Sequence, residues 1–410
     1  MRFRRSIIAA LCVFGLGTAA VRAQNVPYLP STNPVFADAS HILATVNHLI
    51  ELINQYVTPQ TMAPYTTPRN VLDNGGMQVQ QRGTGTRTAG TTTIPSSAYS
   101  ADRWGANVNV TSGAGTLSIE TTDLPSSPIF NAASLFYRTS GALAQPQCVM
   151  QEIPTTRLTP LAGTYVELSF YAKGLALMLA EQTTLNAYLF TGTGVDQGLQ
   201  SFTASPAITP AWTGIASTNT TAFTLTSSWQ RLSTGFAIPT TATEAAVALC
   251  WTPTTGGTAG ATDGFEFTGV QLEQGYAPSA FEFRPFVDEL RVAQSFYAQW
   301  ADSPAATFTL PGTCTETSSG ATAACTLMLP ATLVKTPVVA VAAATSFGMT
   351  KVADGTAEAC TTLATVASSS NLNSIKLTCA VSETAAVGTM HLMLYAATGA
   401  ANTITVSADF

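Results

Sequence analysis

The chain has 410 residues, a length that usually corresponds to two or three domains. Charged residues make up only 10% of the sequence, below the share of about 25% that is usual in soluble domains. The formal net charge is −6, and an acidic chain without basic clusters is a poor candidate for binding nucleic acid.

The first 23 residues have the layout of a secretory signal peptide. Arg2, Arg4 and Arg5 precede an apolar run over 7–19, and small residues lie three and one positions before a cut after Ala23. This run is shorter than the roughly 20 apolar residues that span a bilayer, although an uncleaved anchor is the alternative. Cleavage removes four Arg, so Lys plus Arg falls from 17 to 13 against 23 acids and the net charge becomes −10. No later stretch is typical of a membrane span, so we expect a secreted, periplasmic or cell-surface protein.

Six of the seven cysteines lie after the predicted signal peptide. An even number of cysteines in an exported chain favours disulfides, and six allow fifteen pairings. Pairing within each proposed domain predicts Cys148–Cys250, Cys314–Cys325 and Cys360–Cys379. The chain has no CxxC motif and only three His, so zinc is not expected.

Residues 24–69 are expected to form an N-terminal helix and a Pro-rich linker. Apolar residues from Val35 to Tyr56 recur at alternating steps of four and three, which is the 3.5-residue period of a coiled-coil seam. The pattern continues to residue 57 and covers about three heptads, so a coiled coil and an amphipathic helix packed on its own domain both explain it. Three prolines within 58–69 mark the linker.

Residues 70–285 contain short alternating or β-branched runs between Gly, Pro, Ser and Thr clusters, a pattern typical of a β-sandwich. The polar stretch 191–221 is expected to be a long loop, and such loops in compact β domains are usually functional or disordered. Residues 286–302 return to helical spacing and are expected to form a connecting helix. Short strands predict a second β-sandwich-like domain over 303–410, which is long enough for its own core.

Seven short strings within 70–300 carry a family resemblance. They are Asn70–Gly83, Tyr99–Trp104, Trp229–Arg231, Phe236–Pro239, Phe267–Gly275, Phe281–Phe286 and Gln294–Tyr297. In order and spacing they resemble the carbohydrate-binding-module-like jelly roll of phage and prophage tail fibres. The resemblance covers over half of the chain. It implies an all-β, two-sheet jelly roll that holds glycans on an open face or in loops, and that is often trimeric in fibres.

The resemblance also bears on metal binding and on the kind of protein. Carbohydrate-binding families of similar shape often hold a structural Ca²⁺ with acids, but the matching positions Gln78, Thr268 and Gly269 carry no carboxylate. We therefore expect neither this calcium site nor any other cofactor. Phage fibres carry no export signal, so the predicted signal peptide departs from that family and suggests a bacterial protein that acquired the module.

The candidate ligand-binding residues lie in polar loops and at strand ends, because sugars are bound by aromatic faces together with polar hydroxyl partners. They are Trp212, Asp196, Gln197, Tyr137, Arg138 and Trp251. Trp212, inside the 191–221 stretch, is the first choice, although a Trp that plugs the loop onto the sandwich explains its position equally well. Residues expected to serve packing or to brace strand ends are Trp104, Trp229, Phe267, Arg103 and Arg284.

Common catalytic motifs are missing from the sequence, which has no GxSxG, HExxH or GxxxxGK[ST]. Its three His lie in the N-terminal helix and the last domain, which leaves little for a Ser-His-Asp triad. Glu120 with Asp123, or Asp263 with Glu266, offers the acid pair of glycoside hydrolysis, but nearby acids are common on any surface. We therefore expect no enzyme activity and no catalytic residue.

These observations predict an exported, non-catalytic protein that recognises a cell-surface or matrix polysaccharide, like a receptor-binding module or adhesin. Residues 35–57 suggest a homo-oligomer, with a trimer as the state implied by the resemblance. The alternative is a structural fibre or extracellular matrix component that acts through protein–protein contacts. A glycan hydrolase or lyase is the third hypothesis, with the least support from the sequence.

Overall fold

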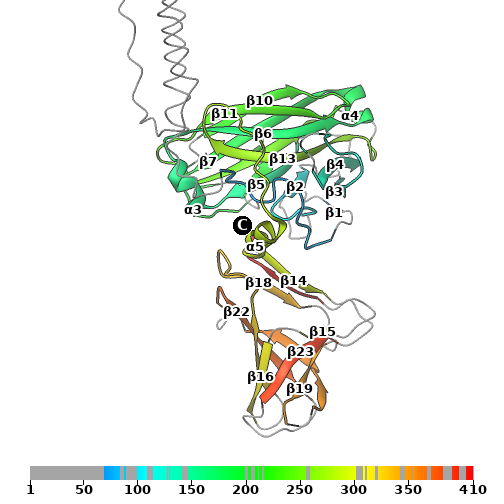
Figure 1. Ribbon diagram of the computed structural model, residues 1–410, viewed down its shortest axis with the longest axis vertical. Helices are drawn as coiled ribbons and strands as arrows, with labels where there is room; N and C mark the ends of the chain where they lie inside the picture. The colour runs from blue at the N-terminus through cyan, green and yellow to red at the C-terminus, as the bar shows by residue number, and fades with distance from the viewer. Residues whose placement is uncertain are drawn as a thin grey trace, which may run out of the picture. The chain divides into compact units, whose positions relative to one another are not determined.

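The computed structural model describes residues of the second of two units in the chain, Pro68–Phe410 (Figure 1). It describes residues 69–409 except for 84–86, 89–98, 109–113, 127, 129, 141–145, 199–201, 205–207, 211, 215–216, 255–258, 302–307, 310–311, 319–321, 342–346, 354, 367–370, 382–389 and 397–402. The predicted signal peptide, the heptad pattern and the Pro-rich linker therefore lie outside the described residues.

Two antiparallel sheets form the first domain of the second unit. The first sheet contains β1 (Arg87–Thr88), β3 (Ala114–Glu120), β4 (Ala133–Ser140), β6 (Tyr165–Gly174), β11 (Gln230–Ala237) and β13 (Gly264–Gln274). The second contains β2 (Gly105–Val108), β5 (Gln147–Ile153), β7 (Thr184–Gly192), β10 (Ser217–Thr224) and β12 (Glu244–Trp251). Their orders are β1-β3-β4-β13-β6-β11 and β10-β7-β12-β5-β2. This is the predicted jelly-roll β-sandwich, in which β13 lies between β4 and β6, and β12 between β7 and β5.

Short elements connect these strands. They are the helices α3 (Thr155–Leu158), η3 (Thr159–Leu161) and α4 (Ala176–Glu181), and the paired strands β8 (Phe202–Ala204) and β9 (Ile208–Pro210). The stretch 191–221, predicted as a loop, thus contains a small β-ladder and the start of β10. The prediction of a loop was wrong because the polar residues of this stretch include many Thr. The β-branched Thr side chain fits a strand as well as a loop.

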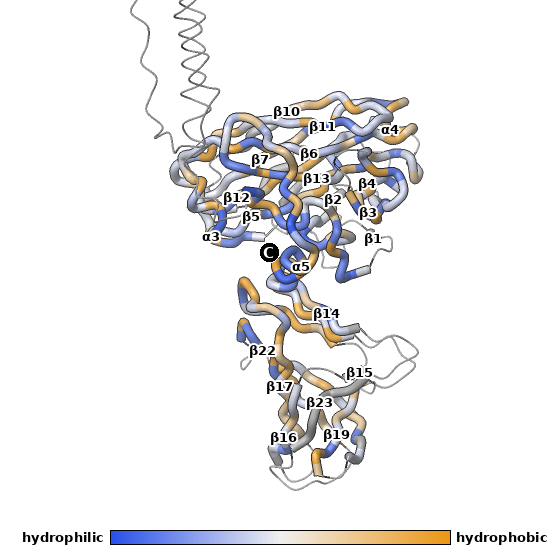
Figure 2. The backbone as a smooth tube through the Cα atoms, viewed as in Figure 1, coloured by the Kyte–Doolittle hydropathy of each residue, from blue (hydrophilic) through white to orange (hydrophobic). Residues whose placement is uncertain are grey.

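Alternation along the strands decides which residues form the core between the sheets. On β7, Leu185, Ala187 and Leu189 belong to that core, whereas Tyr188 and Phe190 belong to a separate cluster on the opposite side of their sheet. Figure 2 shows that apolar residues recur along the strands of both domains. Each buried Leu or Phe side chain contributes about 1.5–3 kcal/mol to folding, so the two sheets are stabilised mainly by this interface.

The opening residues of the domain join β13 at a bulge between Thr268 and Gln271. Asn70 Nδ2 donates to the Val270 carbonyl at 3.0 Å, and Gly269 has a φ of 62°. A Cβ at position 269 would lie 2.6 Å from Phe130 Cζ. Only glycine combines this left-handed backbone with such a close approach.

The region predicted as a helix over 286–302 contains both a helix and a strand. Helix α5 (Phe286–Gln294) begins after Pro285, and its first turn carries Asp288 and Glu289, where negative charge favours the helix dipole. Strand β14 (Tyr297–Ala301) follows directly and pairs with β24 (Thr403–Ser407). The helix is therefore shorter than the sequence pattern suggested.

The remaining strands build the second β domain. They are β15 (Phe308–Thr309), β16 (Gly312–Ser318), β17 (Thr322–Met328), β18 (Val338–Val341), β19 (Phe347–Lys351), β20 (Ala357–Ala359), β21 (Thr362–Thr365), β22 (Ser374–Ala380) and β23 (Met390–Ala396). One sheet has the order β14-β24-β18, and a larger sheet has the order β20-β19-β23-β16-β17-β22-β21, with β15 beside β23. This domain has a hydrophobic core of its own, as its length predicted.

Three disulfides join the cysteines in the predicted pairs, Cys148–Cys250, Cys314–Cys325 and Cys360–Cys379. The first two link residues that stand directly opposite each other on paired strands, β5 with β12 and β16 with β17. Each bond therefore lies within one domain. Among the described helices, none has the length and hydropathy that a bilayer crossing requires.

Candidate functional site

The outer face of the five-stranded sheet carries aromatic and neutral polar side chains on β7 and β10. Tyr188 is half-buried, and its ring stacks on the fully buried Phe190 with centroids 5.4 Å apart and planes at 4°. Strand pairing places the exposed Thr220 on one side of Tyr188 and Ala248 on the other. The residues directly opposite Tyr188 on both paired strands are therefore small.

Asn186 precedes Tyr188 on the same face and is also half-buried. It lies opposite the exposed Ala222 on β10 and opposite Cys250 on β12. An aromatic ring, an amide and the Thr220 hydroxyl thus lie on neighbouring positions of two strands, and none of them is an Asp, Glu, Lys or Arg side chain.

Trp212 lies at one end of this face, where it is 5% exposed and packs with Phe190 and the Cys148–Cys250 disulfide in one cluster. A Cβ at Gly192 would lie 3.2 Å from Trp212 Cε3, so this glycine gives the indole its place. The indole N–H donates to the Gly198 carbonyl at 3.3 Å. This position agrees with the second interpretation of Trp212, in which the indole packs the loop onto the sandwich.

Asp196 and Gln197 lie near Trp212 in a hydrogen-bond network that includes Glu244. The Glu244 carboxylate accepts the Gln197 N–H at 2.8 Å, and Gln197 Oε1 accepts the Thr213 N–H at 2.7 Å. Asp196 Oδ1 accepts the Thr155 N–H at 2.8 Å. The Gln197 contact holds the residue that follows Trp212, so the structure brings together three of the predicted site residues, Trp212, Asp196 and Gln197.

Sequence analysis did not identify Glu244, although it is a lone acid at the start of an apolar strand. Burial raises the pKa of Glu244, while hydrogen bonds from the Gln197 and Gly194 N–H groups lower it and Asp196 raises it. Tyr188 and Asn186, which lie on the outer face of the five-stranded sheet, were also not among the residues predicted from the sequence. The sequence signal for the orientation of Tyr188 is its position along the strand. It alternates with Leu185, Ala187 and Leu189, which belong to the core, and therefore faces away from the core.

The other predicted site residues lie elsewhere in the domain. Arg138 is fully buried, with Nε 2.6 Å from Asp263 Oδ2, and Trp251 is fully buried against Phe136 with ring centroids 5.9 Å apart. Tyr137 is half-buried on β4 of the opposite sheet. Arg138 and Trp251 therefore offer no exposed surface to a ligand, and we assign them to packing.

Two residues expected to serve packing, Trp104 and Phe267, are fully buried in the core. Trp229 differs: it is half-buried, and Lys173 Nζ lies 5.3 Å from its ring centroid. The reason is its position directly before β11, the edge strand of its sheet, where one side of the ring has no neighbouring strand among the described residues.

The acid pairs considered for hydrolysis are held by ion pairs and hydrogen bonds. Lys173 Nζ pairs with Asp123 and lies 3.0 Å from Glu266 Oε2, and Asp263 pairs with the buried Arg138. Hydrogen bonds from Thr122 lower the pKa of Glu120. Each of these acids therefore has an ion pair or a hydrogen bond that holds its carboxylate in place.

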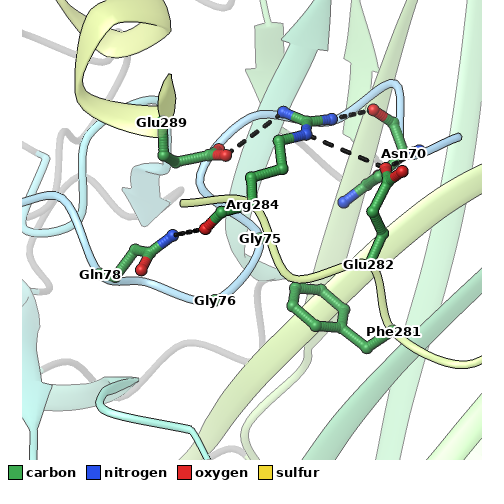
Figure 3. A pocket seen from close by; sticks show the side chains of 8 residues that line it. All are labelled: Asn70, Gly75, Gly76, Gln78, Phe281, Glu282, Arg284 and Glu289. Atoms are coloured by element: carbon green, nitrogen blue, oxygen red, sulfur yellow. Dashed lines mark hydrogen bonds and ion pairs between the residues drawn. The ribbon is translucent and has the colours of Figure 1, made fainter. Parts of the chain in front are cut away.

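A cavity of about 10 Å³ lies between the opening loop and the segment before α5 (Figure 3). Arg284 crosses it and donates to the Asn70 carbonyl, with Nη1 3.4 Å from Glu289 Oε2 and Nε 3.9 Å from Glu282 Oε2. Gln78 Nε2 donates to the Arg284 carbonyl at 3.2 Å. The Arg284 guanidinium supplies the positive charge here, and the described residues contain no group of three or more His, Cys, Asp or Glu suited to a metal ion.

Comparisons with known proteins give distant structural matches. No family model and no curated protein matches the chain. Solved structures that resemble half of the chain include the enzymatically active domain of bacteriophage CBA120 tailspike protein 4, at 14% identity and a TM-score of 0.29, of which 21% is covered. Another is the TmCBM61 module in complex with β-1,4-galactotriose, at 12% identity and 0.26, of which 99% is covered. The family 22 carbohydrate-binding module of Clostridium thermocellum Xyn10B matches 43% of the chain at 12% identity and 0.27, with 89% covered.

Proposed function

We propose that this protein binds carbohydrate, and that the outer face of the five-stranded sheet around Tyr188 is the binding site. The observation that carries the proposal is the partly exposed Tyr188 ring, held by its stack on Phe190 and flanked by Asn186 and Thr220. The stack gives the ring a fixed orientation before a ligand arrives, which lowers the entropic cost of binding.

The chemistry of this face suits a neutral sugar. An aromatic face binds the C–H side of a pyranose ring, and amide and hydroxyl groups can donate to and accept from sugar hydroxyls. Asn186 and Thr220 supply those groups beside Tyr188. The residues that stand directly opposite Tyr188 and Asn186 on the paired strands are uncharged, so an anionic sugar would find no counter-charge at these positions.

Export as a receptor-binding or adhesin-like protein completes the proposal. Three disulfides support it, because such bonds persist in oxidising compartments outside the cytoplasm. The sequence resemblance to tail-fibre modules supports a binding role without catalysis and a homo-oligomer. A structural matrix component that acts through protein contacts is the competing function.

Retention on immobilised polysaccharides tests the proposal. The panel contains neutral galactan, xylan and glucan beside alginate and pectate, and the protein is residues 24–410. We expect retention on a neutral polymer, its loss in Tyr188→Ala, and its survival in Tyr137→Ala, which removes a half-buried tyrosine from the other sheet. No retention on any polymer would contradict carbohydrate binding and favour the structural role.

A further inference from the structure

A second row of polar and aromatic side chains lies on the outer face of the six-stranded sheet, over β6 and the edge strand β11. Opposite pairs in this row are Tyr165–Ala237, Glu167–Gly235, Ser169–Ser233 and Tyr171–Arg231. We call these residues, together with Tyr276, the β6–β11 strip. Six residue steps separate Tyr165 from Tyr171, so the strip is about 20 Å long.

An aromatic platform forms one end of the strip. The rings of Tyr165 and Tyr276 stack with centroids 4.7 Å apart and planes at 15°, and Tyr276 is 38% exposed. The Tyr165 ring lies across the edge strand, because a Cβ at Gly235 would be 2.3 Å from Tyr165 Cε1. Tyr165 therefore holds Tyr276, a large exposed hydrophobic ring, at a defined place on the surface.

Carboxylate acceptors lie next to this platform. Glu167 on β6 stands directly opposite Glu273 on β13, and both are about 95% buried. Ser279 satisfies Glu273 through its N–H at 2.7 Å and its hydroxyl at 2.6 Å. Burial raises the pKa of Glu167, a hydrogen bond from Ser233 lowers it, and the Glu273 charge raises it. Like charges at directly opposite positions destabilise a sheet, so the Glu167–Glu273 pair lowers the free energy of unfolding. A ligand that donates a hydroxyl to Glu167 would offset this loss.

The other end of the strip is also aromatic. The Arg231 guanidinium lies 6.0 Å from the Tyr171 ring centroid and donates to the Ser279 carbonyl. Tyr171 contacts Phe130, which in turn lies 5.3 Å from Phe283, a side chain that is 52% exposed. The strip thus has the exposed Tyr276 at one end and the half-buried Tyr171 beside the exposed Arg231 at the other, with small residues and the Glu167 carboxylate between them.

We propose that the β6–β11 strip is a second binding site, for an extended neutral glycan that stacks on Tyr276 and donates hydroxyls to Glu167. Aromatic rings at both ends match the alternating C–H faces of a linear chain, and the small, half-buried Ser233 lies between them. Glu167 and Glu273 would repel uronate or sialyl groups, which excludes an anionic glycan. This site stands apart from the Tyr188 face, since it lies on the other sheet of the sandwich.

The test is calorimetric titration of the protein with linear neutral oligosaccharides, with oligouronates as the anionic probe. We expect Tyr276→Ala to weaken neutral binding on the order of tenfold, and Tyr276→Phe to keep it because the ring remains. Glu167→Gln should weaken it as well, while Tyr188→Ala should leave this component in place. Because Tyr276 is exposed, its replacement should leave the fold intact.

The outcomes separate the two sites. Binding that Tyr188→Ala abolishes and that Tyr276→Ala and Glu167→Gln leave unchanged overturns the second site and retains the proposed function. Binding that Tyr276→Ala abolishes and that Tyr188→Ala leaves unchanged supports the second site and contradicts the Tyr188 face. Preference for oligouronates overturns the neutral specificity, and binding of neither probe overturns both proposals.

Discussion

Arg103 Nη2 lies 2.6 Å from Glu152 Oε1, and neither side chain is more than 3% exposed. Arg103 also reaches Asp73 and Asp409, and its guanidinium carbon lies 3.5 Å from the ring centroid of Phe296. Asp409, near the end of the second β domain, thus contacts Arg103 of the jelly roll. This buried cluster ties distant parts of the sequence together.

The first prediction concerns the pH dependence of stability. Burial raises the pKa of Glu152 to about 7, with Arg103 lowering it and Asp409 raising it. A folded pKa above the unfolded value means that the folded state holds the proton longer, so the contribution to stability is fully present below about pH 4.5 and is lost as pH rises through 7. Glu152→Gln should therefore gain free energy of unfolding relative to the parent between pH 4.5 and 7.5. Urea titrations at several pH values measure this, and a constant difference between the two proteins would contradict it.

The second prediction concerns Asp409, which pairs with the buried Arg82 and lies 3.6 Å from Arg103. Asp409→Ala removes one of the two carboxylates that hold Arg82, the other being Asp102. Loss of one partner of a buried ion pair costs about 3 kcal/mol because the remaining charge stays buried. Chemical denaturation should show this loss, whereas Asp288→Ala, at an exposed position, should change stability by less than about 0.5 kcal/mol.

The third prediction separates packing from binding at Trp212. Trp212→Ala empties the place over Gly192 and should lower the free energy of unfolding by about 3 kcal/mol. Gly192→Ala should lower it too, because the new Cβ would lie 2.9 Å from Glu244 Oε1 and 3.2 Å from the indole. Denaturation curves check both. Unchanged stability in Trp212→Ala would show that the indole is free to act as a ligand platform.

The fourth prediction concerns the Cys148–Cys250 bond, which closes a sequence separation of 102 residues and lies on the same face of the sheet as Tyr188. Its removal by Cys148→Ala with Cys250→Ala should destabilise the protein by about 2–4 kcal/mol. Thermal unfolding with and without reductant measures the effect. The parent should become sensitive to reductant, and a parent that is indifferent to reduction under unfolding conditions would contradict the bond.

The sequence predicted the β domains and the disulfides better than it predicted which side chains lie on the surface. Alternating apolar residues and turn residues predicted both β domains, because strands and turns depend on local sequence patterns. Pairing the cysteines within each domain predicted the disulfides, because residues of one domain lie close together. Arg138 and Trp251 look like strand-end binding residues in sequence but are buried by partners far along the chain, Asp263 and Phe136. Tyr188 was not among the predicted residues, although its alternation with Leu185, Ala187 and Leu189 indicates that it faces away from the core.

Hydrogen–deuterium exchange with and without a retained neutral glycan tests the central claim most directly. We predict that bound glycan slows amide hydrogen exchange in β7 and β10, around Tyr188 and Thr220, and leaves exchange in the second β domain unchanged. Protection confined to the second β domain, or no change anywhere at saturating glycan, would contradict carbohydrate binding by the five-stranded sheet.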